Sequence, residues 1–287
     1  MQTLYEQYRK LLFTLAYQLT GSVSDAEDAV QDVFLKLYDV KPERLGEPKA
    51  YLCKMVTNRC LDLLKSARKQ REQYFGHWLP EPIMTQSDEP FEAVARSELL
   101  SYAILVLLER LSPSERAVFV LREAFSFEYS AIADLIGKSE TNCRKLISRA
   151  REKMEITTEE PHRTEAVSEE WVQRFLSALE KGNMDVTVAM LAEDVVLLSD
   201  GGGKVLAAVH PIKSRNYVLQ FLHGLMRKAS SYEEGIQVKT KSINGQMGIV
   251  IQSGKNTETV VMMQVKGNLI HRLYFIRNPD KLKRCFV

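Results

Sequence analysis

The N-terminal part of the chain has the hydrophobic pattern of a helical bundle. Across residues 1–69, apolar side chains recur at every third or fourth position, which is the spacing of one helix face. Ser24 and Glu27 have the spacing of a capping box, so a second helix is expected to begin at Ser24. A turn around residues 41–48 precedes a third helix, from about 49 to 69, whose outward positions become basic. The pattern predicts an all-α domain over 1–69.

A second helical domain is predicted over residues 92–155. It follows a segment, 70–91, whose prolines and polar residues are typical of a linker. The run Ser112-Pro113-Ser114-Glu115 combines a serine N-cap, a proline at the first helical position and a glutamate at the third. A short helix is then expected to end at Gly137, and Ser139 is placed to cap the next helix.

The pattern changes after a second polar linker, 156–166. Two helices are expected at about 169–181 and 184–191, and short apolar runs separated by glycine and asparagine turns follow them. These runs, which are expected to be strands, are 195–198, 205–209, 236–240, 247–251, 259–265 and 269–276. Residues 167–287 are therefore predicted to form an α+β domain, with helices on a curved, mainly antiparallel sheet.

Composition and charge exclude several classes of protein. The 39 Lys and Arg residues nearly balance the 37 Asp and Glu residues, so any nucleic-acid surface must come from a local cluster. No apolar run reaches the roughly 18 residues of a membrane span, and the first ten residues lack the character of a secretory signal. The four cysteines and five histidines show no metal-binding spacing. We expect a cytoplasmic protein with no metal, cofactor or membrane partner.

Residues 127–153 carry the clearest functional pattern. Cys143, Leu146, Ile147 and Ala150 form an apolar stripe on the predicted helix after Ser139. A short helix, a glycine turn and a helix with a basic face describe a helix-turn-helix, whose second helix fits the major groove of DNA. A basic helix exposed on a bundle remains the alternative. The outward face of this helix holds Thr141, Asn142, Arg144, Lys145, Ser148, Arg149 and Arg151.

Three segments together resemble a known family. Residues 25–38, DAEDAVQDVFLKLY, and 48–64, PKAYLCKMVTNRCLDLL, closely resemble the second conserved region of extracytoplasmic-function sigma factors. The segment 111–151, with the helix-turn-helix, resembles their fourth region and stands in the right order and separation. The resemblance implies two all-α sigma domains.

Three further motifs resemble the SigJ-like subgroup of these sigma factors. They are WLPEP at 78–82, DGGGK at 200–204 and NPDKL at 278–282. The subgroup carries a SnoaL-like C-terminal domain, which implies an α+β cone with a curved mixed sheet, a pocket and room for a small-molecule ligand. It also implies that this domain folds back on the sigma domains and modulates them.

The resemblance implies specific partners and contact residues. The partners are core RNA polymerase, through its β′ clamp and β flap, and promoter DNA at its −10 and −35 elements. The implied core contacts are Asp25, Asp28, Gln31, Asp32 and Lys36. The implied −10 contacts, beside the loop 39–49, are Tyr51, Lys54, Asn58, Arg59, Lys65, Arg68 and Lys69. The implied −35 contacts are Asn142, Arg144, Lys145, Ser148 and Arg149. The implied regulatory contacts are Trp78, Leu79, Pro80, Asp200, Gly201, Gly202, Gly203, Lys204, Asn278, Pro279 and Asp280.

Two other functions compete with a sigma factor. A helix-turn-helix regulator that does not join polymerase leaves the acidic-faced first domain unused. A SnoaL-like enzyme with a DNA-binding appendage leaves that domain unexplained as well. For the enzyme, the acid–base candidates are Asp200, His210, His223 and His271, but no recognised spacing links them. We therefore expect no catalytic residue and no enzyme activity.

Overall fold

The computed structural model describes residues 2–37, 47–71, 73–85, 100–155, 167–229, 236–254 and 256–283, without the side chains of 67–71. The chain divides into two compact units. Unit 1 combines Met1–Glu72 with Asp88–Thr164, and unit 2 combines Gln73–Ser87 with Glu165–Val287. Within the described residues, no helix is both long enough and apolar enough to cross a bilayer.

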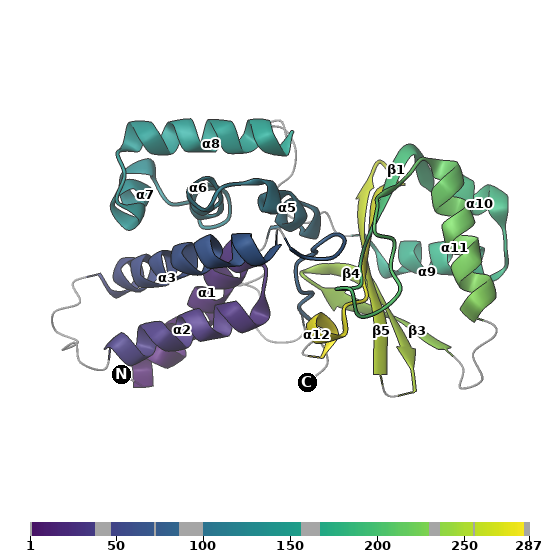
Figure 1. The fold of residues 1–287 in the computed structure, drawn as a ribbon, viewed down its shortest axis with the longest axis horizontal. Helices are drawn as coiled ribbons and strands as arrows, with labels where there is room; N and C mark the ends of the chain where they lie inside the picture. Colours follow the sequence, from purple (N-terminus) through teal and green to yellow (C-terminus); the bar gives the residue numbers. More distant parts are fainter. Residues whose placement is uncertain are drawn as a thin grey trace. The chain divides into compact units, whose positions relative to one another are not determined.

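The first half of unit 1 is a bundle of three helices, α1 (Gln2–Thr20), α2 (Val23–Leu37) and α3 (Pro48–Arg71), each in contact with the other two (Figure 1). The predicted start of the second helix at Ser24 is wrong. Helix α2 begins two residues after Gly21, and the hydroxyl of Ser22 accepts a hydrogen bond from the backbone N–H of Asp25 (3.3 Å). Ser22 therefore fills the capping position that the sequence pattern assigned to Ser24.

The second half of unit 1 contains α5 (Tyr102–Leu107), the 3₁₀ helix η2 (Leu108–Arg110), α6 (Pro113–Glu123), α7 (Tyr129–Ile136) and α8 (Glu140–Met154). The capping box at the start of α6 is confirmed, because Ser112 and Glu115 hydrogen-bond each other's backbone N–H groups. Gly137 ends α7 in the left-handed conformation (φ 65°), and Ser139 caps α8. Helices α6, α7 and α8 form the predicted helix-turn-helix domain.

Arg116 joins the two halves of unit 1. Its side chain is 2% exposed and donates from Nε and Nη2 to the carbonyl oxygen of Gln18 on α1, at 3.4 Å. Its Nη1 donates to Glu109. The side-chain oxygen of Gln18 also accepts from the backbone N–H of Leu100 (3.2 Å). A buried guanidinium with several acceptors thus holds α6 against α1.

Unit 2 contains one mixed sheet of six strands in the order β2-β1-β6-β5-β4-β3. Strands β1 and β6 are parallel, and every other neighbouring pair is antiparallel. The strands are β1 (Leu191–Asp200), β2 (Ile212–Lys213), β3 (Ile236–Ile243), β4 (Gln246–Ser253), β5 (Asn256–Lys266) and β6 (Leu269–Ile276). The helices are α9 (Glu169–Glu180), α10 (Met184–Ala189), α11 (Arg215–Ala229) and α12 (Pro279–Leu282).

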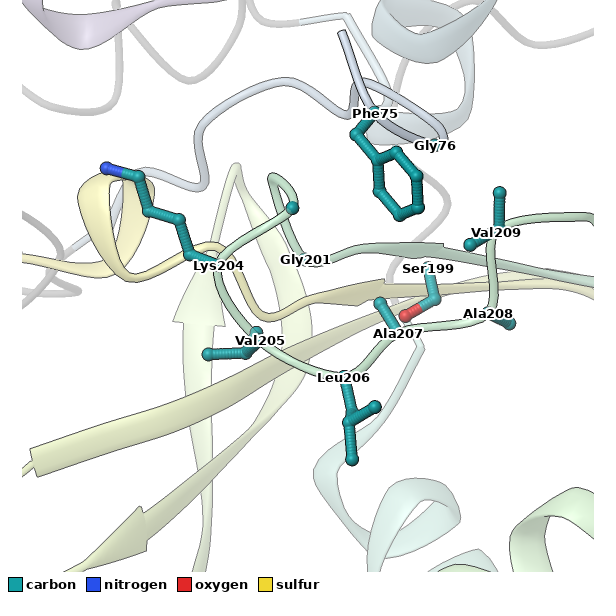
Figure 2. Close-up of a pocket in the computed structure, with 11 residues that line it drawn as sticks. Phe75, Gly76, Ser199, Gly201, Lys204, Val205, Leu206, Ala207, Ala208 and Val209 are labelled. Carbon is teal, nitrogen blue, oxygen red and sulfur yellow. The ribbon is translucent and has the colours of Figure 1, made fainter.

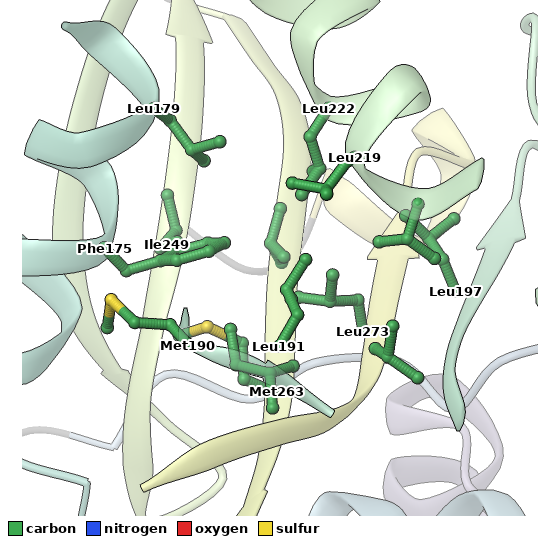
Figure 3. Packing of buried hydrophobic residues seen from close by; sticks show 14 of the residues in the cluster. Phe175, Leu179, Met190, Leu191, Leu197, Leu219, Leu222, Ile249, Met263 and Leu273 are labelled. Carbon is green, nitrogen blue, oxygen red and sulfur yellow. The ribbon is translucent and has the colours of Figure 1, made fainter. Parts of the chain in front are cut away.

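Helices α9, α10 and α11 cover the inner face of this curved sheet, as the predicted SnoaL-like cone requires (Figure 1). The interior of the cone is filled by apolar side chains from the sheet and these helices (Figure 3). Phe175, Met190, Leu219 and Leu273 are among the buried members, and Phe221 meets Phe275 edge to face at 5.8 Å. The space in which a SnoaL-like domain is expected to hold a ligand is therefore packed with side chains.

One expectation for unit 2 is wrong, and two of its elements were not predicted. Residues 205–209 were expected to be a strand, but they form an irregular loop after the β1 end. Helix α11 was not predicted, although Val218, Leu219 and Leu222 give it a buried stripe. The short strand β2, which pairs with β1, was not predicted either.

Candidate functional site

The predicted core-binding residues share one face of α2. Asp28, Gln31 and Lys36 are exposed, and Asp25 and Asp32 are half-buried. Leu35 follows Asp28 by two helical turns and Gln31 by one, so it belongs to the same face. This leucine is 63% exposed and was missed in the sequence reading. We call Asp28, Gln31, Asp32, Leu35 and Lys36 the α2 face.

The predicted −10 residues lie along α3. Tyr51 is 40% exposed, and Lys54, Asn58 and Lys65 are also exposed. Arg59 forms an ion pair with Asp32 on α2 (2.7 Å), which connects the predicted DNA contacts to the α2 face. Arg68 and Lys69 lie on the helix, but their side chains are outside the described residues, as are residues 39–46 of the predicted −10 loop.

The predicted −35 residues are all exposed on α8, opposite its apolar stripe of Cys143, Leu146, Ile147 and Ala150. Arg144 lies over the ring of Tyr129 at the start of α7, 4.2 Å from its centroid, and this contact orients the Arg144 side chain. The positions implied to contact DNA are Asn142, Arg144, Lys145, Ser148 and Arg149.

Two other basic residues of α8 hold the domain together. Arg151 forms an ion pair with Glu123 (2.6 Å), and Lys153 forms one with Glu115 (2.7 Å). Burial alone would raise the pKa of Glu115, but hydrogen bonds from Lys153 and Ser112 lower it. Among the described residues, neither Lys145 nor Arg149 forms a hydrogen bond or an ion pair with another side chain, so both ends are available for phosphates.

The three motifs implied to be regulatory meet inside unit 2, around the carboxylate of Asp200. This side chain is fully buried at the end of β1. Its oxygens accept from the Tyr74 hydroxyl (2.6 Å) and from the backbone N–H groups of Leu79 (2.9 Å) and Gly202 (3.0 Å). They also accept from the ammonium group of Lys281 on α12 (2.7 Å). One carboxylate therefore joins the segment after region 2, the glycine loop and the C-terminal helix.

Lys281 and Tyr74 complete this cluster, and the sequence reading missed both. Lys281 is 6% exposed, donates to the carbonyl oxygen of Leu79 (2.5 Å) and lies over the ring of Trp78, 4.0 Å from its centroid. Burial, the hydrogen bond to Asp200 and the charge of that carboxylate raise the pKa of Tyr74, which keeps its hydroxyl a donor. Asn278 donates to the same hydroxyl (2.8 Å).

Each glycine of the 201–203 loop packs against a different neighbour. A Cβ on Gly201 would lie 2.5 Å from the carbonyl oxygen of Val205, and one on Gly202 would lie 2.4 Å from the Asn278 side chain. A Cβ on Gly203 would lie 3.3 Å from the Cβ of Phe75. Gly202 and Gly203 also have positive φ, which L side chains rarely adopt. The loop is therefore built for close packing.

The segment between regions 2 and 4 is fixed to unit 2 at a second point. We call residues 73–85 the strap. Beyond the Asp200 cluster, Met84 forms an isolated bridge with Ile243, and the backbone N–H of Thr85 donates to Ser242 (2.9 Å). The side chain of Asn244 accepts from the N–H of Ile83 (3.1 Å). The part of the predicted linker 70–91 that lies in the strap is thus an ordered segment of unit 2.

The remaining polar candidates do not form a catalytic site in the described structure. No hydrogen bond or ion pair joins any two of Asp200, His210, His223 and His271 there. The described residues also contain no group of three His, Cys, Asp or Glu side chains arranged to hold a metal ion. Lys204 at the loop end pairs with Asp280, and the hydrogen bond from Lys204 lowers the pKa of Asp280.

Comparison with known proteins shows which family has this arrangement of domains. The Sigma-70 region 2 family matches residues 4–70, and the Sigma-70, region 4 family matches residues 101–154. The chain is 32% identical to the ECF RNA polymerase sigma factor SigJ of Mycobacterium tuberculosis, over 96% of this chain and 91% of that protein. It is 28% identical to the probable ECF RNA polymerase sigma factor SigI of the same species, over 91% and 92% of the two chains.

The similarity extends to the whole three-dimensional structure. The crystal structure of Mycobacterium tuberculosis SigJ matches with a TM-score of 0.79 at 31% identity, covering 98% of both chains. Regions 2 and 4 thus occur in the expected order, and a relative of this identity spans nearly the whole length, C-terminal unit included. The chain belongs to the extracytoplasmic-function RNA polymerase sigma factors.

Proposed function

We propose that this chain binds core RNA polymerase through the α2 face and directs it to promoters, and that its C-terminal unit modulates this activity. The observation that carries the proposal is the combination of two exposed surfaces in unit 1, the α2 face and the outer face of α8. A DNA-binding regulator needs only the second surface, and a SnoaL-like enzyme needs neither. A sigma factor needs no catalytic activity of its own, and the proposed function has the chain acting with polymerase in the cytoplasm.

Leu35 is the best candidate for the energetic centre of the polymerase contact. Most of an interface's binding energy comes from a few residues that become fully desolvated, whereas exposed charges contribute little. The leucine is surrounded by the polar members of the α2 face, which could form the rim. We therefore propose that Leu35 anchors the contact and that Asp28 and Asp32 set the orientation of α2 on the polymerase.

Core binding is tested by comparing two exposed apolar residues. We expect Leu35→Ala to weaken binding to core polymerase by about thirtyfold, because truncating a central anchor costs about 2 kcal/mol. The measurement is titration of fluorescently labelled chain with purified core enzyme, followed by promoter-specific transcription with the same proteins. Met184→Ala, which truncates an apolar residue 48% exposed on α10, is the matched control. Failure of the unaltered chain to start transcription from any promoter, or equal binding by both variants, would contradict the proposal.

If α8 recognises the −35 element, two substitutions on this helix should weaken DNA binding in different ways. Asn142 stands near the helix start, where side chains reach base edges, so Asn142→Ala should cost about 1–3 kcal/mol at one promoter position. Arg149→Ala should weaken all sequences alike and reduce the salt slope of binding by about 1. Both are measured by promoter-binding titrations across salt concentrations and single-base promoter variants. Glu152→Ala, on the same helix, is the control and should not weaken binding; identical behaviour of all three variants would argue against DNA recognition by α8.

The modulating role rests on the strap. Residues 73–85 are part of the segment between region 2 and region 4, and other residues of unit 2 bind them near both ends. A fully extended chain of this length spans about 45 Å. While the strap is docked on unit 2, this length cannot be used to separate regions 2 and 4. A change in strap docking would therefore change how far apart regions 2 and 4 can bind a promoter.

A further inference from the structure

A cavity lies between the strap and the loop that follows β1 (Figure 2). Its volume is about 460 Å³, within the range of small-molecule sites. Phe75 and Gly76 of the strap form one wall, and loop residues through Val209 form the other. All of its lining residues belong to unit 2.

The lining of this cavity is apolar and exposed to solvent. Phe75 is 65% exposed and Leu206 is 79% exposed, and Val205 and Val209 are exposed as well. They are four of the nine large apolar residues that are exposed in the described part of the chain. Scattered exposed apolar residues need no explanation, but a cluster around one hollow marks a binding surface. The irregular course of 205–209, in place of the predicted strand, brings three of them to this hollow.

A buried polar group also lines the cavity. The residue Ser199 on β1 is 2% exposed, and its hydroxyl has no hydrogen-bond partner among the described residues. Figure 2 shows its side chain among the apolar residues of the lining. Buried hydroxyl groups are nearly always hydrogen-bonded, and this one, with no protein partner and a place in the lining, is open to a hydrogen bond from a molecule in the cavity.

The charges around the cavity favour an uncharged ligand. Lys204 is the only charged residue of the lining, and its ammonium group forms an ion pair with Asp280. Arg277, beside the lining, donates from its guanidinium to the carbonyl oxygen of Leu206. The glycine loop lacks the frame of a phosphate-binding loop. In the described part of unit 2, the interior of the cone is occupied by apolar side chains (Figure 3).

We propose that this cavity binds a small, uncharged, largely apolar molecule whose single hydroxyl or carbonyl group hydrogen-bonds the hydroxyl of Ser199. Because Phe75 and Gly76 form one wall, the bound molecule contacts both the strap and the loop, and it favours the docked strap over the released one. This coupling rests on the proposed modulating function. The binding itself does not depend on it.

The test uses two aromatic probes that differ by one hydroxyl group, 2-naphthol and naphthalene. We expect the full chain to bind 2-naphthol in a one-to-one complex, followed by the probe's fluorescence. Ser199→Ala should weaken 2-naphthol binding about five- to tenfold and leave naphthalene binding unchanged, since only the first probe has a hydrogen bond to lose. Ala208→Phe, which fills the cavity, and Leu206→Ser, which makes its rim polar, should weaken both probes. Val238→Ser, an exposed apolar residue on β3 outside the lining, is the control.

Circular dichroism and thermal unfolding show whether each variant folds, and Leu206→Ser keeps the test valid if Ala208→Phe does not. The proposal is overturned if neither probe binds up to its solubility limit, or if binding is the same in Leu206→Ser as in Val238→Ser. Bound 2-naphthol should also slow hydrogen exchange at the Leu79 amide, which donates to Asp200. Unchanged exchange despite binding would overturn the coupling. No polymerase is present, so these outcomes are independent of the transcription test.

Discussion

Replacing Lys281 with methionine is expected to lower the free energy of unfolding of unit 2 by about 3–5 kcal/mol, the usual cost of removing one partner of a buried ion pair. The Asp200 carboxylate is fully buried and would lose the cation that lies 2.7 Å away. The Leu79 carbonyl would lose the same donor. Both tryptophans of the chain, Trp78 and Trp171, belong to unit 2, so their fluorescence in a denaturant titration reports this unit selectively.

The matched control is Lys283→Met, two residues further along. Lys283 has a side chain 74% exposed and pairs with Asp280 at 3.4 Å, an arrangement that contributes little to stability. We expect the unfolding midpoint of the Lys283→Met variant to stay close to that of the unaltered chain. Equal midpoints for the two variants would show that the Asp200 cluster does not hold the strap.

Replacing Arg116 with methionine is expected to destabilise unit 1 by about 2–4 kcal/mol, because a buried guanidinium that donates to two different helices is lost. The Gln18 carbonyl and the Glu109 carboxylate lose this donor together. Most helices of the described chain lie in unit 1, so far-UV circular dichroism in a urea titration follows its unfolding.

Tryptophan fluorescence in the same titration separates the two units. Its midpoint should not move in Arg116→Met, since unit 1 contains no tryptophan. Arg110→Met is the matched control, because Arg110 is 45% exposed and lies 3.4 Å from Glu155. A dichroism midpoint equal to that of the control would refute the role of Arg116 in joining the two halves.

Local signals in the sequence correctly predicted helix ends of the second sigma domain, whereas the helix start predicted at Ser24 in the first was wrong. Ser112 with Glu115, and Gly137 followed by Ser139, are backbone requirements met within a few residues, and the structure confirms them. The prediction of a strand at 205–209 was wrong because a run of apolar residues is typical of a strand. There, the close approach of Gly201 to Val205 fixes an irregular path instead.

The Asp200 cluster was only partly predictable. The motifs were recognised one by one, but the hydrogen bond from Leu79 to Asp200 joins residues 121 positions apart. No local pattern specifies that contact. Tyr74 and Lys281 carry no periodic signal of their own, because each matters only through the carboxylate that the fold brings to it. The exposed leucine of the α2 face could have been found, since it falls on the helical spacing of the residues that were chosen.

The parallel pairing of β1 with β6 has a consequence for the newly made protein. It brings Asp200 beside Ile276, just before α12, so the cation for this carboxylate comes from a part of the chain translated later than either sigma region. Domains generally fold in the order in which they leave the ribosome. In a nascent chain, both halves of unit 1 are therefore expected to fold before the segment between them gains its contacts with Asp200 and Lys281.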